Sequence, residues 1–290
     1  MNRRNFLHTS LGLGALSVLS LDALAETQAK SVGLQLYTLR DDIQKQGIER
    51  ILEQVAKLGY KNVENFGYNQ GKFFGKTPTE YREILKANGL HAVSGHYTTG
   101  RSKKFGTGDG LTKNWEKAVE DAAAIGQKYV VLAYLVDDER SAADYKQLFG
   151  ILNKCAETAK KSGLTLGYHN HDFEFTQKVD GEKPYDLILK NTLVAMEMDL
   201  YWVTKAGEKP TEYFARYPGR FQLWHVKDMA KTPQQEFAEV GTGSIDFADL
   251  FKHARHAGLK YYFVEQDVCK RPPLESIKIS IDNINKANWG

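Results

Sequence analysis

The fold is decided near the middle of the chain, where YVVLAYL (129–135) is followed by DYKQLFGILNKCAETAKKSG (144–163) and then by LTLGYHNH (164–171). The first and last pieces are short, apolar and rich in β-branched and aromatic residues, as buried strands are. The middle piece has the helical spacing of apolar residues and stops at Gly163, and glycine commonly ends a helix. This order predicts two parallel strands joined by a crossover helix.

The same alternation continues from Ser31 to the end of the chain. Further strands are expected in VGLQLY (32–37), NVENFG (62–67), HAVSGHY (91–97), VAMEMDLY (194–201), FQLWHVKDM (221–229) and YYFVEQD (261–267). The helices between strands stop at glycines, among them Gly59, Gly89, Gly126 and Gly258. Eight strand–helix pairs favour an α/β fold closed into a single (β/α)8 TIM barrel over residues 31–290, with a parallel eight-stranded barrel at its centre.

Residues 1–25 are predicted to be an export signal peptide. They begin with the pair Arg3-Arg4, continue through a weakly apolar run and close on Ala23-Leu24-Ala25, a small-x-small cleavage pattern. The paired arginines favour a twin-arginine signal over a plain secretory one. The apolar run is short and interrupted by glycine and serine, so stable membrane insertion is not expected. The sequence thus predicts a periplasmic or otherwise exported protein.

The composition limits the partners that the protein can have. The chain has 290 residues and a net charge of +3, with acidic and basic residues interspersed. A nucleic-acid-binding protein usually shows a basic face or stripe, so nucleic acid is not an expected partner. No G-x-G-x-x-G motif follows the first strand, which argues against a dinucleotide. We expect a small-molecule ligand.

Ionisable and polar residues follow the expected strands. Active sites of TIM barrels are built at the carboxyl ends of the strands, so these residues are the candidate site. They are Gln35, Tyr37, Glu64, His96, Tyr134, His169, His171, Asp199, His225, Lys227, Glu265 and Asp267. Strand interiors should be apolar, because desolvating a lone charge costs several kcal/mol. We therefore expect the charges to gather at one end of the barrel.

Three of these residues predict a metal site. Asp199, His225 and Glu265 end the sixth, seventh and eighth strands. Converging carboxylates repel one another unless a cation neutralises them, and a carboxylate–imidazole–carboxylate set suits one divalent ion such as manganese, magnesium, cobalt or zinc. The fifth strand offers His169, His171 and Glu174 as further ligands. Alternate residues of a strand share a face, so one histidine could bind the metal while the other contacts substrate.

From Ser31 onward the chain resembles the xylose isomerase-like TIM barrels, the group of sugar phosphate isomerases and epimerases. The matching segments are LQLYTLRD, LGYHNHDFEF, MDLYW, WHVKD, GTGSIDF and FVEQD. The resemblance implies a sugar substrate and a metal held by Asp199, His225 and Glu265. Many epimerases of the superfamily carry a glutamate ligand and base inside the fifth strand, where this chain has Gly167. His169 is the preferred replacement ligand, with Glu174 as its competitor.

The chemistry of such a site is proton transfer beside a carbonyl. A divalent ion acidifies the C–H next to a sugar carbonyl, and Glu265, His171 and His169 are candidates for the base. Lys227 could hold an enolate oxygen or a phosphate, or it could form an ion pair with Glu265 or Asp228. The residues expected to bind the sugar are Gln35, Tyr37, Glu64, His96, Glu174 and Trp202.

The sequence therefore predicts a divalent-metal-dependent isomerase or epimerase that acts through an enediolate on a free or keto sugar. The branch bearing YHNHDFEF also resembles exported 3-keto-glycoside lyases and hydratases, so elimination on the same site is the alternative. A non-catalytic sugar-binding barrel is the alternative of another class. An endonuclease IV-like nuclease would need further metal ligands and a basic DNA face, and export argues against it.

Overall fold

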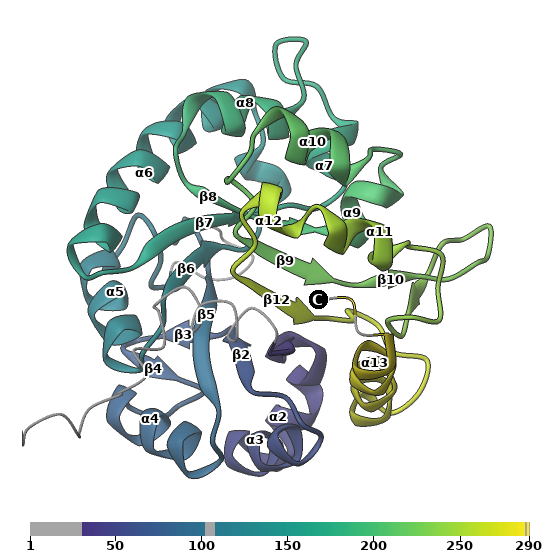
Figure 1. Ribbon diagram of the computed structural model, residues 1–290. Helices are drawn as coiled ribbons and strands as arrows, with labels where there is room; N and C mark the ends of the chain where they lie inside the picture. Colours follow the sequence, from purple (N-terminus) through teal and green to yellow (C-terminus); the bar gives the residue numbers. More distant parts are fainter. Residues whose placement is uncertain (1–30, 102–107, 288, 290) are drawn as a thin grey trace, which may run out of the picture.

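The computed structural model describes residues 31–101, 108–287 and 289, and the predicted export signal at residues 1–25 lies outside them. The described chain contains a closed barrel of eight parallel strands, which confirms the predicted fold (Figure 1). Each strand neighbours the next along the chain, and the last pairs with the first. The strands are β1 (Gly33–Gln35), β2 (Asn62–Asn65), β5 (His91–Tyr97), β6 (Tyr129–Leu132), β7 (Thr165–His169), β8 (Ala195–Asp199), β9 (Leu223–Val226) and β12 (Tyr261–Val264).

Helices surround the barrel (Figure 1). They are η1 (Leu36–Leu39), α2 (Arg40–Gln46), α3 (Ile48–Lys57), α4 (Pro78–Ala87), α5 (Trp115–Ala124), η2 (Asp137–Glu139), α6 (Ala142–Lys161), α7 (Phe173–Thr176), α8 (Pro184–Asn191), α9 (Leu200–Lys205), α10 (Pro210–Arg216), α11 (Phe247–Lys252), α12 (Ala254–Ala257) and α13 (Pro273–Ala287). The glycines predicted to stop helices have the left-handed backbone that suits this role, as at Gly59 (φ 104°) and Gly163 (φ 74°). Within the described segments, none of the helices has both the length and the apolar character needed to cross a membrane.

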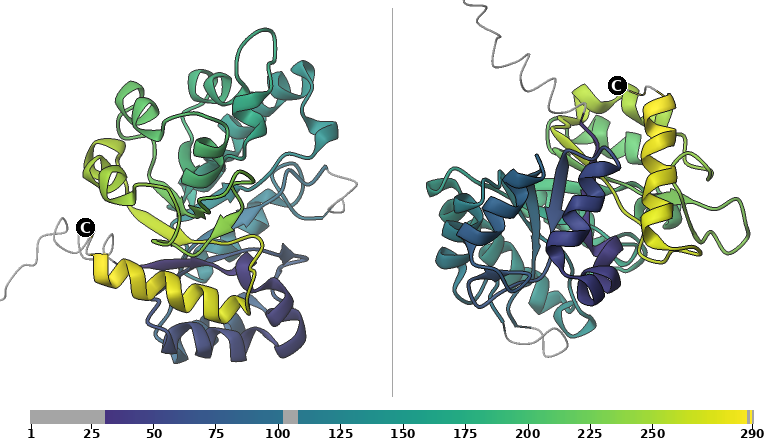
Figure 2. Two further views of the ribbon diagram at one scale, coloured as in Figure 1. Left: turned by 90° about the vertical axis from the view of Figure 1, so that its right-hand side faces the viewer. Right: turned by 90° about the horizontal axis from the view of Figure 1, so that it is seen from below.

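The last helix closes the ring of helices. Figure 2 shows α13 lying beside the first helices of the chain. The buried Tyr60 hydroxyl donates a hydrogen bond of 2.8 Å to the carbonyl of Ile277 in α13. Residues from both ends of the described chain are therefore in direct contact.

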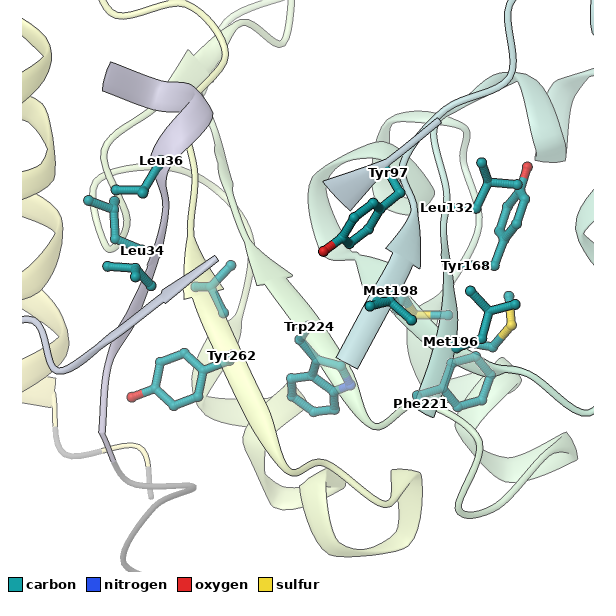
Figure 3. Packing of buried hydrophobic residues seen from close by; sticks show 14 of the residues in the cluster. Leu34, Leu36, Tyr97, Leu132, Tyr168, Met196, Met198, Phe221, Trp224 and Tyr262 are labelled. Carbon is teal, nitrogen blue, oxygen red and sulfur yellow. The ribbon is translucent and has the colours of Figure 1, made fainter. Parts of the chain in front are cut away.

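Alternate residues of each strand face opposite sides of the barrel wall. Met196, Met198 and Trp224 belong to the large cluster between strands and helices, part of which Figure 3 shows. Trp224, for example, stacks on Phe214 of α10 with ring centroids 4.9 Å apart. The residue before Trp224, Leu223, belongs instead to a small separate cluster. This period of two fixes which side chains reach the barrel interior.

The small cluster forms an apolar floor inside the barrel. Its members are Val93, Tyr129, Val131, Ala195, Leu223, Tyr261 and Phe263. On β8, β9 and β12 the next inward position after each floor residue is Glu197, His225 and Glu265, and all three are buried. The floor thus excludes water from below and leaves polar side chains above it. Gly33 has no side chain in this layer, because an added Cβ would lie 2.5 Å from Cδ1 of Phe263.

Two short hairpins extend from the barrel: β3 (Tyr68–Asn69) with β4 (Lys72–Phe73), and β10 (Asp228–Met229) with β11 (Phe237–Ala238). Asp228 organises the loop after β11. Its carboxylate accepts backbone N–H groups of Gly241 and Gly243 at 2.9 and 2.8 Å. A Cβ on Gly243 would lie 2.2 Å from this carboxylate, which explains the glycine there. The GTGSIDF segment (241–247), which follows β11, is therefore anchored to Asp228, two residues after the end of β9.

We predict that Gly33→Ala destabilises the protein by about 1–3 kcal/mol, because the methyl group overpacks the floor against Phe263. Gly150→Ala is the matched control, since Gly150 lies in α6 with open space around it. Alanine there should stabilise the helix by about 0.5–1 kcal/mol. Urea unfolding measures both changes. Equal effects of the two substitutions would contradict the packing of the floor.

Candidate metal centre

Four side chains from four strands converge above the floor. His169, Asp199, His225 and Glu265 follow or end β7, β8, β9 and β12, and each offers a ligand atom within 4.8 Å of the others. All four residues are buried. They are the four ligands predicted from the sequence, and their order on consecutive strands is what brings them together. Glu174 belongs to neither group of candidate ligands in the described chain.

His169 is held in the tautomer that a metal ligand needs. Its Nδ1 lies 3.1 Å from the carbonyl oxygen of Ala133 and donates to it, which leaves a lone pair on Nε2. Nε2 lies 3.4 Å from Oδ2 of Asp199. Both atoms are buried; among the described residues Nε2 has no hydrogen-bond partner, whereas Oδ2 faces the ammonium of Lys227 at 2.9 Å. A buried imidazole lone pair that faces a carboxylate oxygen fits a shared cation.

His225 lies between carboxylates on both sides of its ring. Nδ1 is 2.8 Å from Oε2 of Glu265, and Nε2 is 2.6 Å from Oε2 of Glu64. Burial by itself would lower the pKa of His225, but the carboxylates of Glu197, Glu265 and Glu64 outweigh it and hold that pKa well above its usual value. When Nδ1 binds a metal, the Nε2–H can still donate to Glu64, which then orients the ligand from behind.

Lys227 forms an ion pair with the same carboxylates. Its ammonium lies 2.9 Å from Asp199 Oδ2, 2.8 Å from Glu265 Oε2 and 3.0 Å from Asp267 Oδ2. Burial opposes the charge, yet these three carboxylates raise the pKa of Lys227 well above its usual value. The predicted pairing with Glu265 is therefore present. Asp228, the other partner considered, instead accepts backbone N–H groups of its own loop.

Glu197 is the residue that sequence reasoning missed. The expectation that strand interiors are apolar fails at Glu197, which lies inside β8, fully buried, one inward position before Asp199. Its Oε2 lies 2.6 Å from Nε2 of His96. Burial and the neighbouring Glu64 carboxylate raise the pKa of Glu197 well above its usual value. The signal was present in VAMEMDLY, where the period of two puts Glu197 on the face of Asp199.

Glu64 and His96, two of the residues predicted to bind the sugar, lie inside the barrel. Glu64 is fully buried and accepts a 2.8 Å hydrogen bond from Nε2 of Gln35. Burial would raise the pKa of Glu64, but His96 and His225 lower it to about 2. The register of β2 against β5 shifts between Val63 and Glu64, and such a bulge re-aims neighbouring side chains. Both residues contact the group of candidate ligands through Glu64, whose Oε2 lies 2.6 Å from Nε2 of His225 and 3.3 Å from Nε2 of His96.

Four other predicted site residues lie around this core. His171 packs against the rings of Tyr134 and Trp202, with centroids 4.7 and 5.6 Å away. Burial, with His169 and Lys227 nearby, lowers the pKa of His171 well below its usual value, so the ring is neutral. Tyr37 is 41% exposed and lies in η1, because β1 ends at Gln35. Trp202, in α9, is half-buried.

Glu174 serves the backbone of His171. Its Oε2 accepts the His171 N–H at 2.8 Å, and its Oε1 accepts the Tyr168 hydroxyl at 2.8 Å. Burial raises the pKa of Glu174 to about 7. Its position in α7 makes it a support for the loop after β7, and the predicted ligand at that strand is His169.

We predict that Glu174 makes stability fall as pH rises. Burial raises the pKa of this carboxyl from 4.5 to about 7. Below pH 4.5 the group is protonated in both the folded and the unfolded state, so it does not affect the free energy of unfolding. As the pH rises from 4.5 to 7 it destabilises the fold, by about 3 kcal/mol in total. Glu174→Gln removes this ionisation, so its free energy of unfolding should fall less between pH 5 and pH 7.5. Urea unfolding at both values measures the difference. The exposed control Glu212→Gln should keep the wild-type slope, and an unchanged slope in Glu174→Gln would contradict the assignment.

Comparison with known proteins supports the barrel fold and shows the family. The sequence model of the xylose isomerase-like TIM barrel matches residues 52–287. The crystal structure of a sugar phosphate isomerase/epimerase from Parabacteroides distasonis ATCC 8503 has a TM-score of 0.75 and 30% identity, over 96% of this chain and 99% of that chain. A second structure described in the same way, from the same organism, has a TM-score of 0.76 and 27% identity, over 89% and 99%.

A more distant structure shares the fold. The IOLI protein with a binding zinc atom has a TM-score of 0.68 and 14% identity, over 90% of this chain and 99% of that chain. No protein of curated function matches the sequence significantly. The resemblance drawn from LGYHNHDFEF, WHVKD and the other segments is thus confirmed by the match over residues 52–287. The chain belongs to the xylose isomerase-like TIM barrel family.

Proposed function

We propose that this protein is a divalent-metal-dependent isomerase or epimerase of a free or keto sugar. The observation that carries the proposal is the convergence of His169, Asp199, His225 and Glu265, with His169 Nε2 buried and without a hydrogen-bond partner among the described residues. These four side chains would hold the ion. When bound there, a divalent ion polarises a sugar carbonyl and acidifies the neighbouring C–H bond.

His171 is the base in this proposal. Its ring is neutral because burial lowers its pKa, and its Nδ1 has no hydrogen-bond partner among the described residues. It lies next to the ligand His169, with ring centroids 4.9 Å apart. Glu265 is the weaker candidate. Burial would raise its pKa, but Lys227 and His225 lower it well below its usual value, which suits a ligand better than a base.

Lys227 would neutralise negative charge on the substrate oxygen. Its ammonium is fully buried and already contacts two of the ligand carboxylates, so it lies within the same small volume. Asp267 provides a third carboxylate for the ammonium. Lys227 could therefore remain in an ion pair if Asp199 and Glu265 bound a metal ion. A fixed positive charge in a site shielded from water stabilises a developing oxyanion.

Aromatic rings line the side of the centre next to Lys227. The ammonium lies 5.8 Å from the ring of Trp202 and 5.6 Å from that of Phe237. Phe237 comes from β11, so the hairpin covers this side. The indole N–H of Trp202 is buried and has no acceptor in the described chain. An apolar wall with one free donor suits a pyranose face and a sugar hydroxyl.

Elimination by a 3-keto-glycoside lyase or hydratase is the second candidate, and His169 favours it. In place of a carboxylate on the fifth strand, the chain has an imidazole whose Nδ1 is tied to Ala133, so a symmetric pair of carboxylate bases is not available. Structures that share the fold include an L-ribulose 3-epimerase and a probable 3-DHS dehydratase, so the barrel accommodates both outcomes. Product analysis with 3-keto-glycosides in deuterated water separates the two candidates. Deuterium at carbon without loss of a group supports epimerisation or isomerisation.

The choice of a free sugar rests on the predicted export signal at residues 1–25, because cells keep phosphorylated intermediates inside. The adjacent Arg3-Arg4 pair and the Ala23-Leu24-Ala25 pattern support a twin-arginine leader. Cell fractionation tests this part of the proposal, and full-length precursor confined to the cytoplasm would contradict it.

We predict that Glu265→Gln lowers the affinity for a divalent metal and lowers turnover with it. The loss of affinity should exceed the roughly 10- to 100-fold loss that follows when a residue that only supports a ligand is replaced. The reason is that the substitution removes a charged ligand atom. Metal analysis after dialysis and a sugar-turnover assay give the two readouts. Glu212→Gln, which changes an exposed glutamate of α10, should change neither. Wild-type metal content in Glu265→Gln would overturn the ligand assignment.

His171→Gln should separate the base from the ligands. We expect kcat to fall by about 10²- to 10⁴-fold, because the proton acceptor is lost, while metal content stays at the wild-type level. Exchange of the substrate C–H with solvent deuterium should slow by the same factor. Retention of full exchange would assign the base to another residue, and loss of the metal would make His171 a ligand.

A further inference from the structure

A second group of potential metal ligands lies directly beneath the first. Glu64, His96, Glu197 and His225 offer ligand atoms that lie within 4.8 Å of one another. They come from β2, β5, β8 and β9, so the group spans the barrel interior. The side chains of Glu64 and Glu197 are fully buried, whereas that of His96 is 11% exposed. His225 belongs to both groups and connects them.

The hydrogen bonds of this group leave two carboxylate oxygens without donors. Oε2 of Glu64 is approached by Gln35, His225 and His96 at 2.8, 2.6 and 3.3 Å. Oε2 of Glu197 is approached by His96 at 2.6 Å and by His225 at 3.4 Å. Oε1 of Glu64 and Oε1 of Glu197 are buried and have no partner in the described chain. Buried carboxylate oxygens normally accept hydrogen bonds or bind a cation, because an unsatisfied charged acceptor is costly.

We propose that Glu64, His96 and Glu197 bind a second divalent cation beneath the first. Two carboxylate oxygens and one imidazole nitrogen suit zinc, manganese or cobalt, and three protein ligands leave a coordination position for water or substrate. His225 need not lose both ring protons, because its Nε2–H continues to donate to Glu64 while Nδ1 faces the first site. The side chain of His96 is 11% exposed, so this group is not completely closed to solvent.

Charge balance supports this site. Glu64 and Glu197 lie close together inside the barrel, and among the described residues the only side chains that touch them and can carry a positive charge are the two histidines, because Lys227 pairs with Asp199, Glu265 and Asp267. A divalent ion offsets the repulsion of the two carboxylates and satisfies their orphaned oxygens together. A water molecule could satisfy the same oxygens, and in that case the protein binds one ion.

Metal stoichiometry tests the proposal. Dialysed protein is titrated with zinc and with manganese by calorimetry, and the ions retained per chain are counted by plasma mass spectrometry. We expect two ions in the wild type, one in His96→Gln, one in Glu265→Gln and none in the double variant. His91→Gln is the matched control: His91 lies at the exposed start of the same strand, and this variant should retain two ions.

The outcomes separate this site from the first one. One ion at saturation in the wild type, lost in Glu265→Gln and kept in His96→Gln, would overturn the second site and leave the proposed function intact. Two ions in His96→Gln would also overturn it. Circular dichroism shows whether each variant is folded, and the wild-type titration decides the question even if a variant is not.

Discussion

The central constraint on this structure is the burial of four acidic side chains around one imidazole, which requires compensating positive charge. Glu64, Glu197, Asp199 and Glu265 all lie within 4 Å of a ring nitrogen of His225. In a medium of low dielectric such charges destabilise one another strongly unless cations neutralise them. His225 and Lys227 supply part of the positive charge, and their raised pKa values are the consequence. In the proposed function, a divalent ion would supply the remaining positive charge.

The barrel can sustain this arrangement because its strands are rigid and its floor is dry. The floor cluster, which includes Val131 and Phe263, closes the interior below, while the outward cluster fixes each strand against the helices. Side chains on such a frame hold their positions more accurately than side chains on loops. Supporting hydrogen bonds complete the fixation: Gln35 holds Glu64, Ala133 holds His169, and Glu174 holds the backbone of His171.

Much of this architecture is predictable from the sequence because it follows from periodicity. Alternating apolar runs and helical stretches predict the barrel, and the order of Asp199, His225 and Glu265 on successive strands predicts their convergence. The expectation of apolar strand interiors, in contrast, concealed Glu197, which is buried inside β8. The ion-pair and hydrogen-bond partners of the site residues also could not be predicted from the sequence alone. Lys227 pairs with acidic groups that are close only in the folded structure, such as Asp267. Glu174 lies in α7, where its carboxylate accepts the backbone N–H of His171 and so supports the loop after β7.

The central claim is that His169, Asp199, His225 and Glu265 share one divalent ion. Anomalous diffraction from crystals grown with manganese tests it most directly. The account predicts a strong peak in contact with all four side chains. The absence of a peak there at saturating manganese, with Lys227 still paired to Asp199 and Glu265, would contradict it.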